Sequence, residues 1–287
     1  MRTSSSLRLV LAALTAQREA LHAHEAGARA GKDPEQLHQM RVAVRRLRAI
    51  LRASRSLFAA QWVRGLRREL DWLGGALGRA RDLDVLRAYL APELSSLPAA
   101  DRAAGRRVLR RLDRDRVAAR STLRATLRSP RYARLLARLR ASFARPPVST
   151  GDVSLLGVAA GEFKKLRKAV RALPGRPDAD ELHVVRIKVK RARYAAELVR
   201  AIAGKPAERF IDQAKTVQDI LGEHQDAVVI EEYLHQIVDR TEGGRDVERY
   251  FAKRQRKRRK QTRSAFFDEW PKLERRGRQA WDEVAPS

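Results

Sequence analysis

The stretch that decides the fold is "LHQMRVAVRRLRAIL", residues 37–51, which the chain writes a second time as "LHVVRIKVKRARYAA", residues 182–196. In both copies the apolar residues recur every three or four positions, so that at 100° per residue they fall on one side of a helix. We expect an amphipathic helix in each copy, with Asp33 before Pro34 as the first N-cap and Asp180 before Glu181 as the second. The expected buried stripes are Leu37, Met40, Val44, Leu47 and Leu51, and then Leu182, Val185, Val189, Ala192 and Ala196.

A second stripe in each copy is basic. Like charges at these spacings repel by a few tenths of a kcal/mol per pair, and the first copy interleaves no carboxylate among them. A solvated helix face would alternate its signs, so the pattern predicts a surface that binds an anion. The alternative, a basic face in solvent, accounts for one stripe but not for its repetition with the same histidine. The first basic column is His38, Arg41, Arg45, Arg48 and Arg52; the second is His183, Arg186, Lys190 and Arg193, with Glu197 in the place of Arg52.

The repetition extends beyond these helices. His38 aligns with His183 (183 − 38 = 145), and "LGRARDLDV" at 77–85 aligns with "LGEHQDAVV" at 221–229, which pairs Asp82 with Asp226 (226 − 82 = 144). Two matches at nearly one offset predict an internal duplication. The halves would be residues 1–143 and 155–287, joined by the proline-containing linker 144–154.

The "LG…D" segments have an expected structural role. Because glycine costs a helix about 1 kcal/mol against alanine, we expect Gly78 and Gly222 to allow close helix packing. We expect Asp82 and Asp226 to orient a neighbouring arginine or histidine rather than to act as general bases.

The fold class follows from the spacing of apolar residues along the whole chain. Helical periodicity dominates and β-branched runs are scarce, which predicts an all-α protein. Proline and glycine mark the expected breaks at 30–35, 90–101, 128–132, 173–181, 203–208 and 242–246. Each half then holds about four long helices, which predicts two four-helix bundles.

Charge bounds the class of ligand. The 287 residues include 62 Lys plus Arg against 34 Asp plus Glu, a net charge of +28, and such a surplus attracts a polyanion: nucleic acid, polyphosphate or an acidic membrane surface. Aromatic residues make up only 6% of the chain and do not alternate with the basic columns, as a platform for stacking bases would require. A nucleic-acid binder that contacts phosphates alone stays the alternative.

Two features are absent from the sequence, cysteine and a long apolar run. Cysteine is absent, which excludes disulfides and thiolate metal sites. No apolar run reaches the roughly 18 residues of a membrane span, and Arg8 interrupts the short apolar stretch at the amino terminus. We expect a soluble, cytoplasmic protein.

The histidines of the two columns are expected to touch the anion, because each lies in the second turn of its helix, near the end that favours negative charge. No second histidine at i+4 and no carboxylate pair completes a metal site. No carboxylate cluster for Mg²⁺, phosphate-binding glycine loop or nucleophile–base pair is visible, so an enzyme that cuts or forms polyphosphate is disfavoured.

Other basic residues are softer candidates for the same ligand. Within the run "RQRKRRKQTR" we expect Arg254, Arg258 and Arg259 to point outward, and His224 receives no role. The softer candidates are Arg107, Arg111 and Arg114 in the first half, and Lys164, Lys168, Lys215, Arg249, Lys253, Arg256 and Lys260 in the second.

The two "LH..R" segments, each followed by "LG…D", together resemble the CHAD domain, a family of α-helical domains named for its histidines, over roughly residues 5–285. The resemblance implies two four-helix bundles related by a pseudo-twofold axis, with a basic channel between them that binds inorganic polyphosphate and is lined by the two basic columns. Many members carry a CYTH domain that acts on triphosphates, for which this chain has no room. The resemblance therefore implies a non-catalytic binding module without a cofactor, cytoplasmic and associated with polyphosphate granules.

Overall fold

A computed structural model describes residues 2–99, 101–149, 153–238 and 244–282. This part of the chain folds into eight α-helices and one short 3₁₀ helix and holds no β-strand, apart from a single antiparallel bridge between Phe58 and Val148. The all-α prediction is confirmed. The helices are α1 (Arg2–Ala30), α2 (Pro34–Ala53), η1 (Arg55–Leu57), α3 (Ala60–Ser95), α4 (Arg102–Arg128), α5 (Pro130–Ala144), α6 (Leu155–Arg171), α7 (Ala179–Val238) and α8 (Gly244–Trp281).

Helix ends follow the capping chemistry of the sequence at three of the expected breaks, 30–35, 128–132 and 173–181, whereas the break expected at 242–246 lies partly outside the described residues. The Asp33 carboxylate accepts the backbone N–H of Glu35 at 2.8 Å, with Pro34 at the first helical position of α2. The α7 cap differs from the prediction. The helix begins two residues earlier than Asp180 requires, because Asp178 accepts the Glu181 N–H at 2.9 Å while the Glu181 carboxylate accepts the Asp178 N–H at 2.8 Å. This reciprocal capping box is stronger than a single cap.

Two interruptions and one uninterrupted proline complete the helix pattern. Gly204 has φ of 61° inside α7, where it separates two helical segments at the expected "AGKPAE" break. Conversely, α3 continues through Pro92 to Ser95, past the start of the break expected at 90–101. The turn at η1 has neither proline nor glycine and was not expected; the buried Ser54 hydroxyl donates to the Ile50 carbonyl at 2.8 Å there.

The chain forms two compact units. The first unit comprises the described residues of Leu7–Gly151 and Ile237–Val247, and the second those of Met1–Ser6, Asp152–Gln236 and Glu248–Ser287. The Ser6 hydroxyl donates to the Val153 carbonyl at 3.4 Å, which ties the amino-terminal segment to the second unit. The halves expected at 1–143 and 155–287, each as a four-helix bundle, stay predictions.

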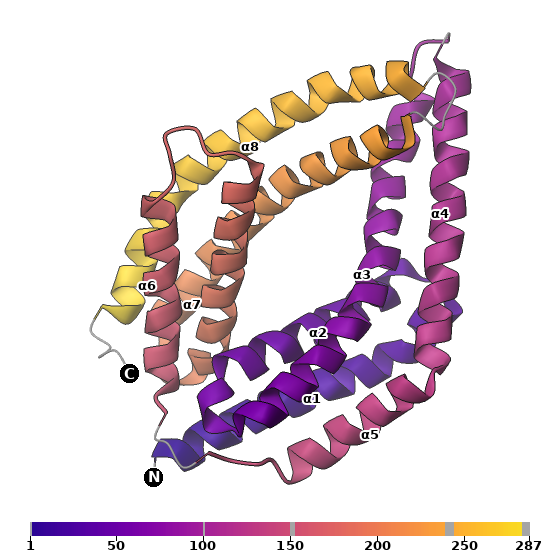
Figure 1. Ribbon diagram of the computed structural model, residues 1–287. Helices are drawn as coiled ribbons and strands as arrows, with labels where there is room; N and C mark the ends of the chain where they lie inside the picture. The colour runs from indigo at the N-terminus through magenta and orange to yellow at the C-terminus, as the bar shows by residue number, and fades with distance from the viewer. Residues whose placement is uncertain (1, 100, 150–152, 239–243, 283–287) are drawn as a thin grey trace. The chain divides into compact units, whose positions relative to one another are not determined.

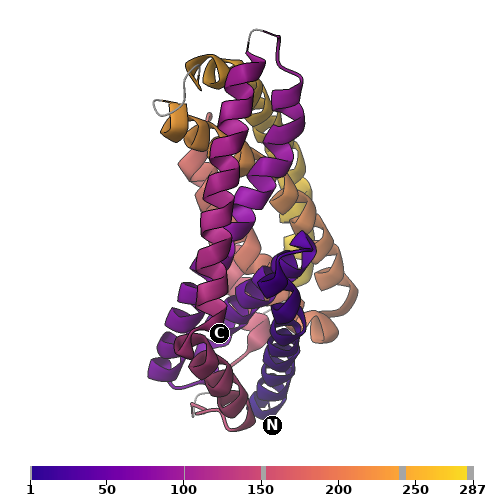
Figure 2. The ribbon, with the colours of Figure 1, turned by 90° about the vertical axis from the view of Figure 1, so that its right-hand side faces the viewer.

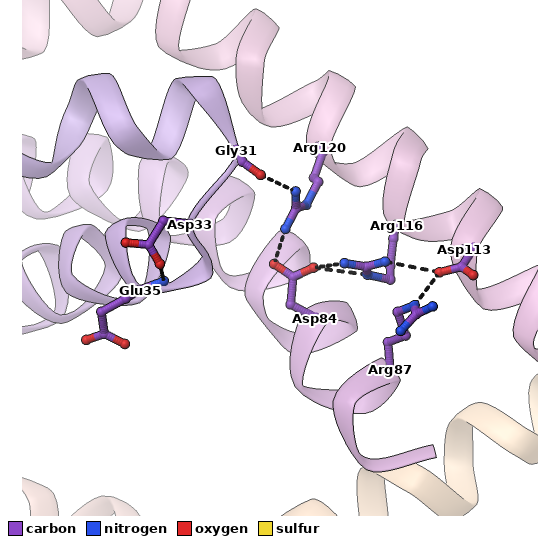
Figure 3. Close-up of polar contacts among 8 residues, drawn as sticks. All are labelled: Gly31, Asp33, Glu35, Asp84, Arg87, Asp113, Arg116 and Arg120. Carbon is purple, nitrogen blue, oxygen red and sulfur yellow. Dashed lines mark hydrogen bonds and ion pairs between the residues drawn. The ribbon is translucent and has the colours of Figure 1, made fainter. Parts of the chain in front are cut away.

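In the first unit α2 packs along α3, and α3 runs beside α4 (Figures 1 and 2). The α2 stripe from Leu37 to Leu51 is buried at all five expected positions. A buried carboxylate joins α3 to α4 (Figure 3): Asp84 accepts hydrogen bonds from Arg116 at 2.8 and 3.0 Å and from Arg120 at 2.9 Å.

In the second unit α6, α7 and α8 share an aromatic core. Phe210 of α7 meets Phe163 of α6 at 5.6 Å and Trp281 of α8 at 5.9 Å between ring centroids, both edge to face. The stripe from Leu182 to Ala196 is buried at all five expected positions. Before Gly204, α7 therefore presents its apolar side to the core and its basic column along the boundary with solvent.

Candidate anion-binding site

The first basic column lies on the side of α2 that faces α3, where two of its arginines lie beside glycines of α3. A Cβ atom at Gly78 would stand 3.8 Å from Arg41 Nε, and one at Gly74 would stand 3.3 Å from Arg48 Nη1. The guanidinium groups therefore lie across the glycine positions of the neighbouring helix. The expected close approach of helices at Gly78 is in fact a place for an arginine side chain.

The second column repeats one of these contacts. A Cβ atom at Gly222 would stand 3.7 Å from Arg186 Nη2, as at the aligned pair of Gly78 and Arg41. Two segments that align in the sequence thus bring the same arginine to the same glycine, each within its own unit. This recurrence is the most specific feature shared by the two columns.

Carboxylates from α3 reach the first column, contrary to the expectation of uninterrupted positive charge. Arg41 Nη2 lies 3.1 Å from Asp82 Oδ1, and Arg48 forms an ion pair with Asp71. The pairing of Asp82 with an arginine is the orienting role expected for it. Both ion pairs are partly exposed, with side chains between 35% and 57% accessible, so solvent screens them and each contributes about 1 kcal/mol or less.

Arg193 of the second column is buried, with only 7% of the residue exposed. Its Nε donates to Gln218 Oε1 at 3.1 Å and its Nη1 donates to Glu197 Oε1 at 2.7 Å. The guanidinium carbon also lies 4.5 Å from the centre of the Tyr194 ring. Arg193 thus links the two segments of α7 and differs from the partly exposed arginines of the first column.

The two histidines stand in different surroundings. Burial lowers the pKa of His38, and the positive charges of Arg81, Arg45 and Arg41 lower it further against the opposing charge of Glu35. His38 is therefore neutral at pH 7 when no anion is bound.

His183 instead has an amide neighbour. Its Nδ1 lies 2.6 Å from Gln225 Oε1, and because that oxygen can only accept, Nδ1 carries the proton. Position 225 aligns with Arg81, so the two units place an amide and a guanidinium at matching positions. Nδ1 is thereby occupied, and Nε2 is the ring nitrogen of His183 that is left to meet an anion.

The softer candidates are spread over several helices. Arg111 lies 3.4 Å from Asp115, and Lys215 donates to Asp212 at 2.9 Å. Arg107 is half-buried on α4. The remaining members are exposed: Arg114 on α4, Lys164 and Lys168 on α6, and Arg249, Lys253, Arg256 and Lys260 on α8.

A cavity in the second unit gathers residues that the sequence did not bring together. His224, Arg256, Lys260 and Arg263 line it, together with Arg259, which pairs with Glu231 at 3.0 Å. The outward positions expected for Arg258 and Arg259 are wrong, because Arg259 pairs with Glu231 and Arg258 lies 3.8 Å from Glu223, both carboxylates of α7. A signal was present in the sequence: His224 stands inside the aligned "LG…D" segment, where the first half has Ala80.

Across the described ranges, no group of three or more histidine, aspartate and glutamate residues has the geometry to hold a metal ion. In the same ranges, no helix combines the length and the apolar character that crossing a membrane demands.

Comparison with known proteins identifies the architecture. The family model of the CHAD domain matches residues 12–235. The crystal structure of the CHAD domain from the plant Ricinus communis superposes with a TM-score of 0.67 at 26% identity, over 98% of this chain and 92% of that one. PptA from Streptomyces chartreusis shares the fold with a TM-score of 0.77 at 23% identity, over 92% of this chain and 99% of that one.

Curated relatives are longer than this chain. Two uncharacterized proteins from strains of Mycobacterium tuberculosis, MT2285 and Rv2226, are each 33% identical to it over 218 residues. The match covers 70% of this chain and 40% of each relative, so the chain corresponds to less than half of those proteins.

Proposed function

Because the chain belongs to the CHAD family, we propose that it binds inorganic polyphosphate through its two basic columns, as a binding module without catalysis of its own. The observation that carries the proposal is the repeated contact of an arginine with a glycine, Arg41 over Gly78 and Arg186 over Gly222. Both units thus hold a guanidinium group beside the same position of the neighbouring helix, where it can bind an anion.

The chemistry of the ligand fits the columns. Polyphosphate carries roughly one negative charge per phosphate and has no bases, so cations and hydrogen-bond donors suffice to bind it. The partly exposed pairs of Arg41 and Arg48 with carboxylates are weak enough for phosphate oxygens to replace. The proposed ligands are His38, Arg41, Arg45, Arg48, His183, Arg186 and Lys190, whereas we assign the buried Arg193 a structural role.

Both columns belong to one molecule, and a long chain can engage them together. Once one column has bound a segment of polyphosphate, contact of the same polyphosphate chain with the other column is intramolecular. We therefore expect affinity to rise with chain length beyond what the number of phosphates alone explains.

The test is a calorimetric titration with long-chain polyphosphate at several salt concentrations. The variant Arg45→Glu combined with Lys190→Glu should bind at least ten-fold more weakly, with a shallower dependence on salt, because fewer counterions are released. The control with the same change in net charge is Arg134→Glu combined with Arg275→Glu, at exposed positions of α5 and α8 outside the columns. Equal losses in the two variants would reject the columns as the site.

Nucleic acid is the competitor in the same titration. Displacement of polyphosphate by DNA or RNA at equal phosphate concentration would favour the alternative function, which rests on the net charge of +28. Incubation with polyphosphate and Mg²⁺, followed by measurement of free phosphate, tests the absence of catalysis.

A further inference from the structure

The two units differ at one place in how they neutralise a pair of arginines that aligns between them. In the first unit Asp84, with 4% of its side chain exposed, neutralises Arg116 and Arg120 (Figure 3). Arg120 also donates to the Gly31 carbonyl at 2.7 Å, in the loop that leads into α2. A buried carboxylate is thus enclosed by two guanidinium groups and by the start of the next helix.

The second unit keeps the arginines. Arg263 donates to the Pro177 carbonyl at 3.5 Å, in the loop that leads into α7, as Arg120 does to Gly31. The offset between these arginines (263 − 120 = 143) is close to that of the other repeats, and it aligns Arg116 with Arg259. The burial pattern agrees, because Leu112, Ala119 and Leu123 of α4 and the aligned Gln255, Thr262 and Phe266 of α8 are all buried.

The carboxylate has no counterpart. In the "LG…D" alignment Asp84 corresponds to Val228, which cannot accept a hydrogen bond. The nearby pair of Arg87 with Asp113 corresponds to Glu231 with Arg256, the same charges in exchanged places. The second unit therefore holds one carboxylate fewer around three arginines, and Lys260 in the place of Val117 adds a further cation.

A cavity of about 320 Å³ is lined by the four cations of this set, Arg256, Arg259, Lys260 and Arg263. It has room for a phosphate and several water molecules, since a water molecule takes about 30 Å³. His224 lines it and is only 5% exposed, and its ring makes no hydrogen bond to any residue that the structure describes. Burial lowers the pKa of His224 to about 4, with further lowering by Arg259 and Arg263, so the ring is neutral and still has one N–H to donate.

The acidic groups nearby do not remove the positive field. Asp178 lines the cavity, and its carboxylate caps α7 through the Glu181 N–H. Glu231 lies 3.0 Å from Arg259, and burial raises the pKa of this carboxyl group against the opposing charges of Arg259 and Arg256. Two carboxylates, those of Asp178 and Glu231, thus stand against four cations and an imidazole donor.

We propose that this cavity is a phosphate site, in which a bound phosphate group takes the place that the Asp84 carboxylate has in the first unit. Arg259 and Arg263 bind its oxygens as Arg116 and Arg120 bind Asp84, and the His224 ring donates a further hydrogen bond. The ligand is either free inorganic phosphate or a phosphoryl group of a longer chain. The site lies within the second unit and does not depend on the basic columns.

The decisive variant is Val228→Asp, which supplies the missing carboxylate from the protein itself. The matched control is Val229→Asp, the same change of charge one residue along α7 at a position 36% exposed. The readout is the ring ¹⁵N and ¹H signals of His224 during titration with inorganic phosphate at constant ionic strength. We expect saturable shifts in the wild type and in Val229→Asp, and binding at least ten-fold weaker in Val228→Asp.

A second variant guards against misfolding. Arg256→Gln combined with Lys260→Gln changes two exposed residues of the cavity and should weaken phosphate binding at least three-fold while the melting temperature stays near that of the wild type. Wild-type affinity in both this variant and Val228→Asp would overturn the proposal.

Titration with two different ligands distinguishes the two possible sources of the phosphate group. Shifts of His224 with inorganic phosphate, absent in Val228→Asp, identify a site for the free anion. Shifts only with short-chain polyphosphate, again absent in Val228→Asp, identify a site for a phosphoryl group of the chain, and no shift with either overturns the proposal. The variant Arg45→Glu with Lys190→Glu should keep the His224 response, so that failure of the basic columns and failure of this site are distinguishable.

Discussion

Removing the charge of Asp84 should destabilise the first unit more than removing any exposed carboxylate. In Asp84→Asn the side chain keeps nearly the same volume, but Arg116 and Arg120 lose the anion that both contact at 2.8–3.0 Å. Breaking a buried ion pair by removing one partner costs about 3–5 kcal/mol. Because the arginine side chains remain 23% and 25% exposed, water compensates them in part, and we expect the lower end of this range, about 3 kcal/mol.

The matched control is Asp71→Asn. Asp71 also pairs with an arginine of the first unit, Arg48, but both side chains are more than 40% exposed, so the expected loss is about 1 kcal/mol or less. Urea unfolding followed by tryptophan fluorescence and circular dichroism measures both losses. Urea is preferred because guanidinium is a salt and screens the charges under study. The difference is read from the midpoints at unchanged slope.

One result would refute the reasoning. If Asp84→Asn is no less stable than Asp71→Asn in urea, the buried carboxylate does not neutralise the two arginines in solution. The comparison with the second unit, where Val228 stands at the aligned position, would then lose its basis.

Four further predictions concern single side chains. The folded-state pKa of His224, about 4, lies below its ordinary value, so the stability that the neutral ring contributes is complete above pH 6.5 and is lost as pH falls toward 4. In urea unfolding, His224→Asn should therefore lose about 2 kcal/mol less of its free energy of unfolding between pH 7 and pH 4.5 than the wild type loses. The control is His22→Asn at an exposed position, which should lose as much as the wild type. Arg193→Ala should cost about 2 kcal/mol, since it leaves Gln218 and Glu197 without their buried donor, whereas Arg45→Ala, at a half-buried position, should cost less. Gly222→Ala should raise the free energy of unfolding by about 0.5–1 kcal/mol because its Cβ meets nothing closer than 3.7 Å, and Gly277→Ala should lower it by about 1–3 kcal/mol because its Cβ would stand 2.1 Å from Phe163. Burial and three arginines lower the pKa of His38, so bound polyphosphate should raise this pKa. Calorimetry near pH 6 in buffers of different ionisation enthalpy should detect proton uptake on binding, and this uptake should be smaller in His38→Gln. The affinity for polyphosphate should increase as pH falls.

The sequence predicted features that depend on one helix at a time. The apolar stripe of α2 depends only on spacing, and all five of its expected residues are buried. The break at Gly204 follows from the conformational freedom of glycine beside Pro206, and the Asp33 cap from the proline after it.

Features that depend on two helices were not predictable. Asp71 and Asp82 reach the first basic column from α3, and which carboxylate meets which arginine depends on the axial register of the two helices. The sequence pattern of α2 contains no information on that register. The expectation of a column without carboxylates was therefore correct for α2 alone and wrong for its surroundings.

Aligned positions of the two halves are most informative about function where the two halves carry different residues. Where they agree, as at Gly78 and Gly222, both copies keep the same contact with an arginine. Where Asp84 aligns with Val228, packing alone does not explain the change, because the arginines are retained and guanidinium groups near a protein interior need an anion or water.

His224, four residues before Val228 in α7, indicates whether water or an anion compensates the charge of these arginines. Water alone could hydrate the arginines, but it would not account for a buried imidazole at position 224, where the first half has alanine. Because His224 stays neutral beside Arg259 and Arg263, it does not attract an anion by charge, but its ring can still donate one hydrogen bond. A donor and two guanidinium groups around one cavity form the complement of an oxyanion. The loss of an internal carboxylate and the gain of His224 are therefore best understood as one change, which replaces an anion of the protein by an anion from solution.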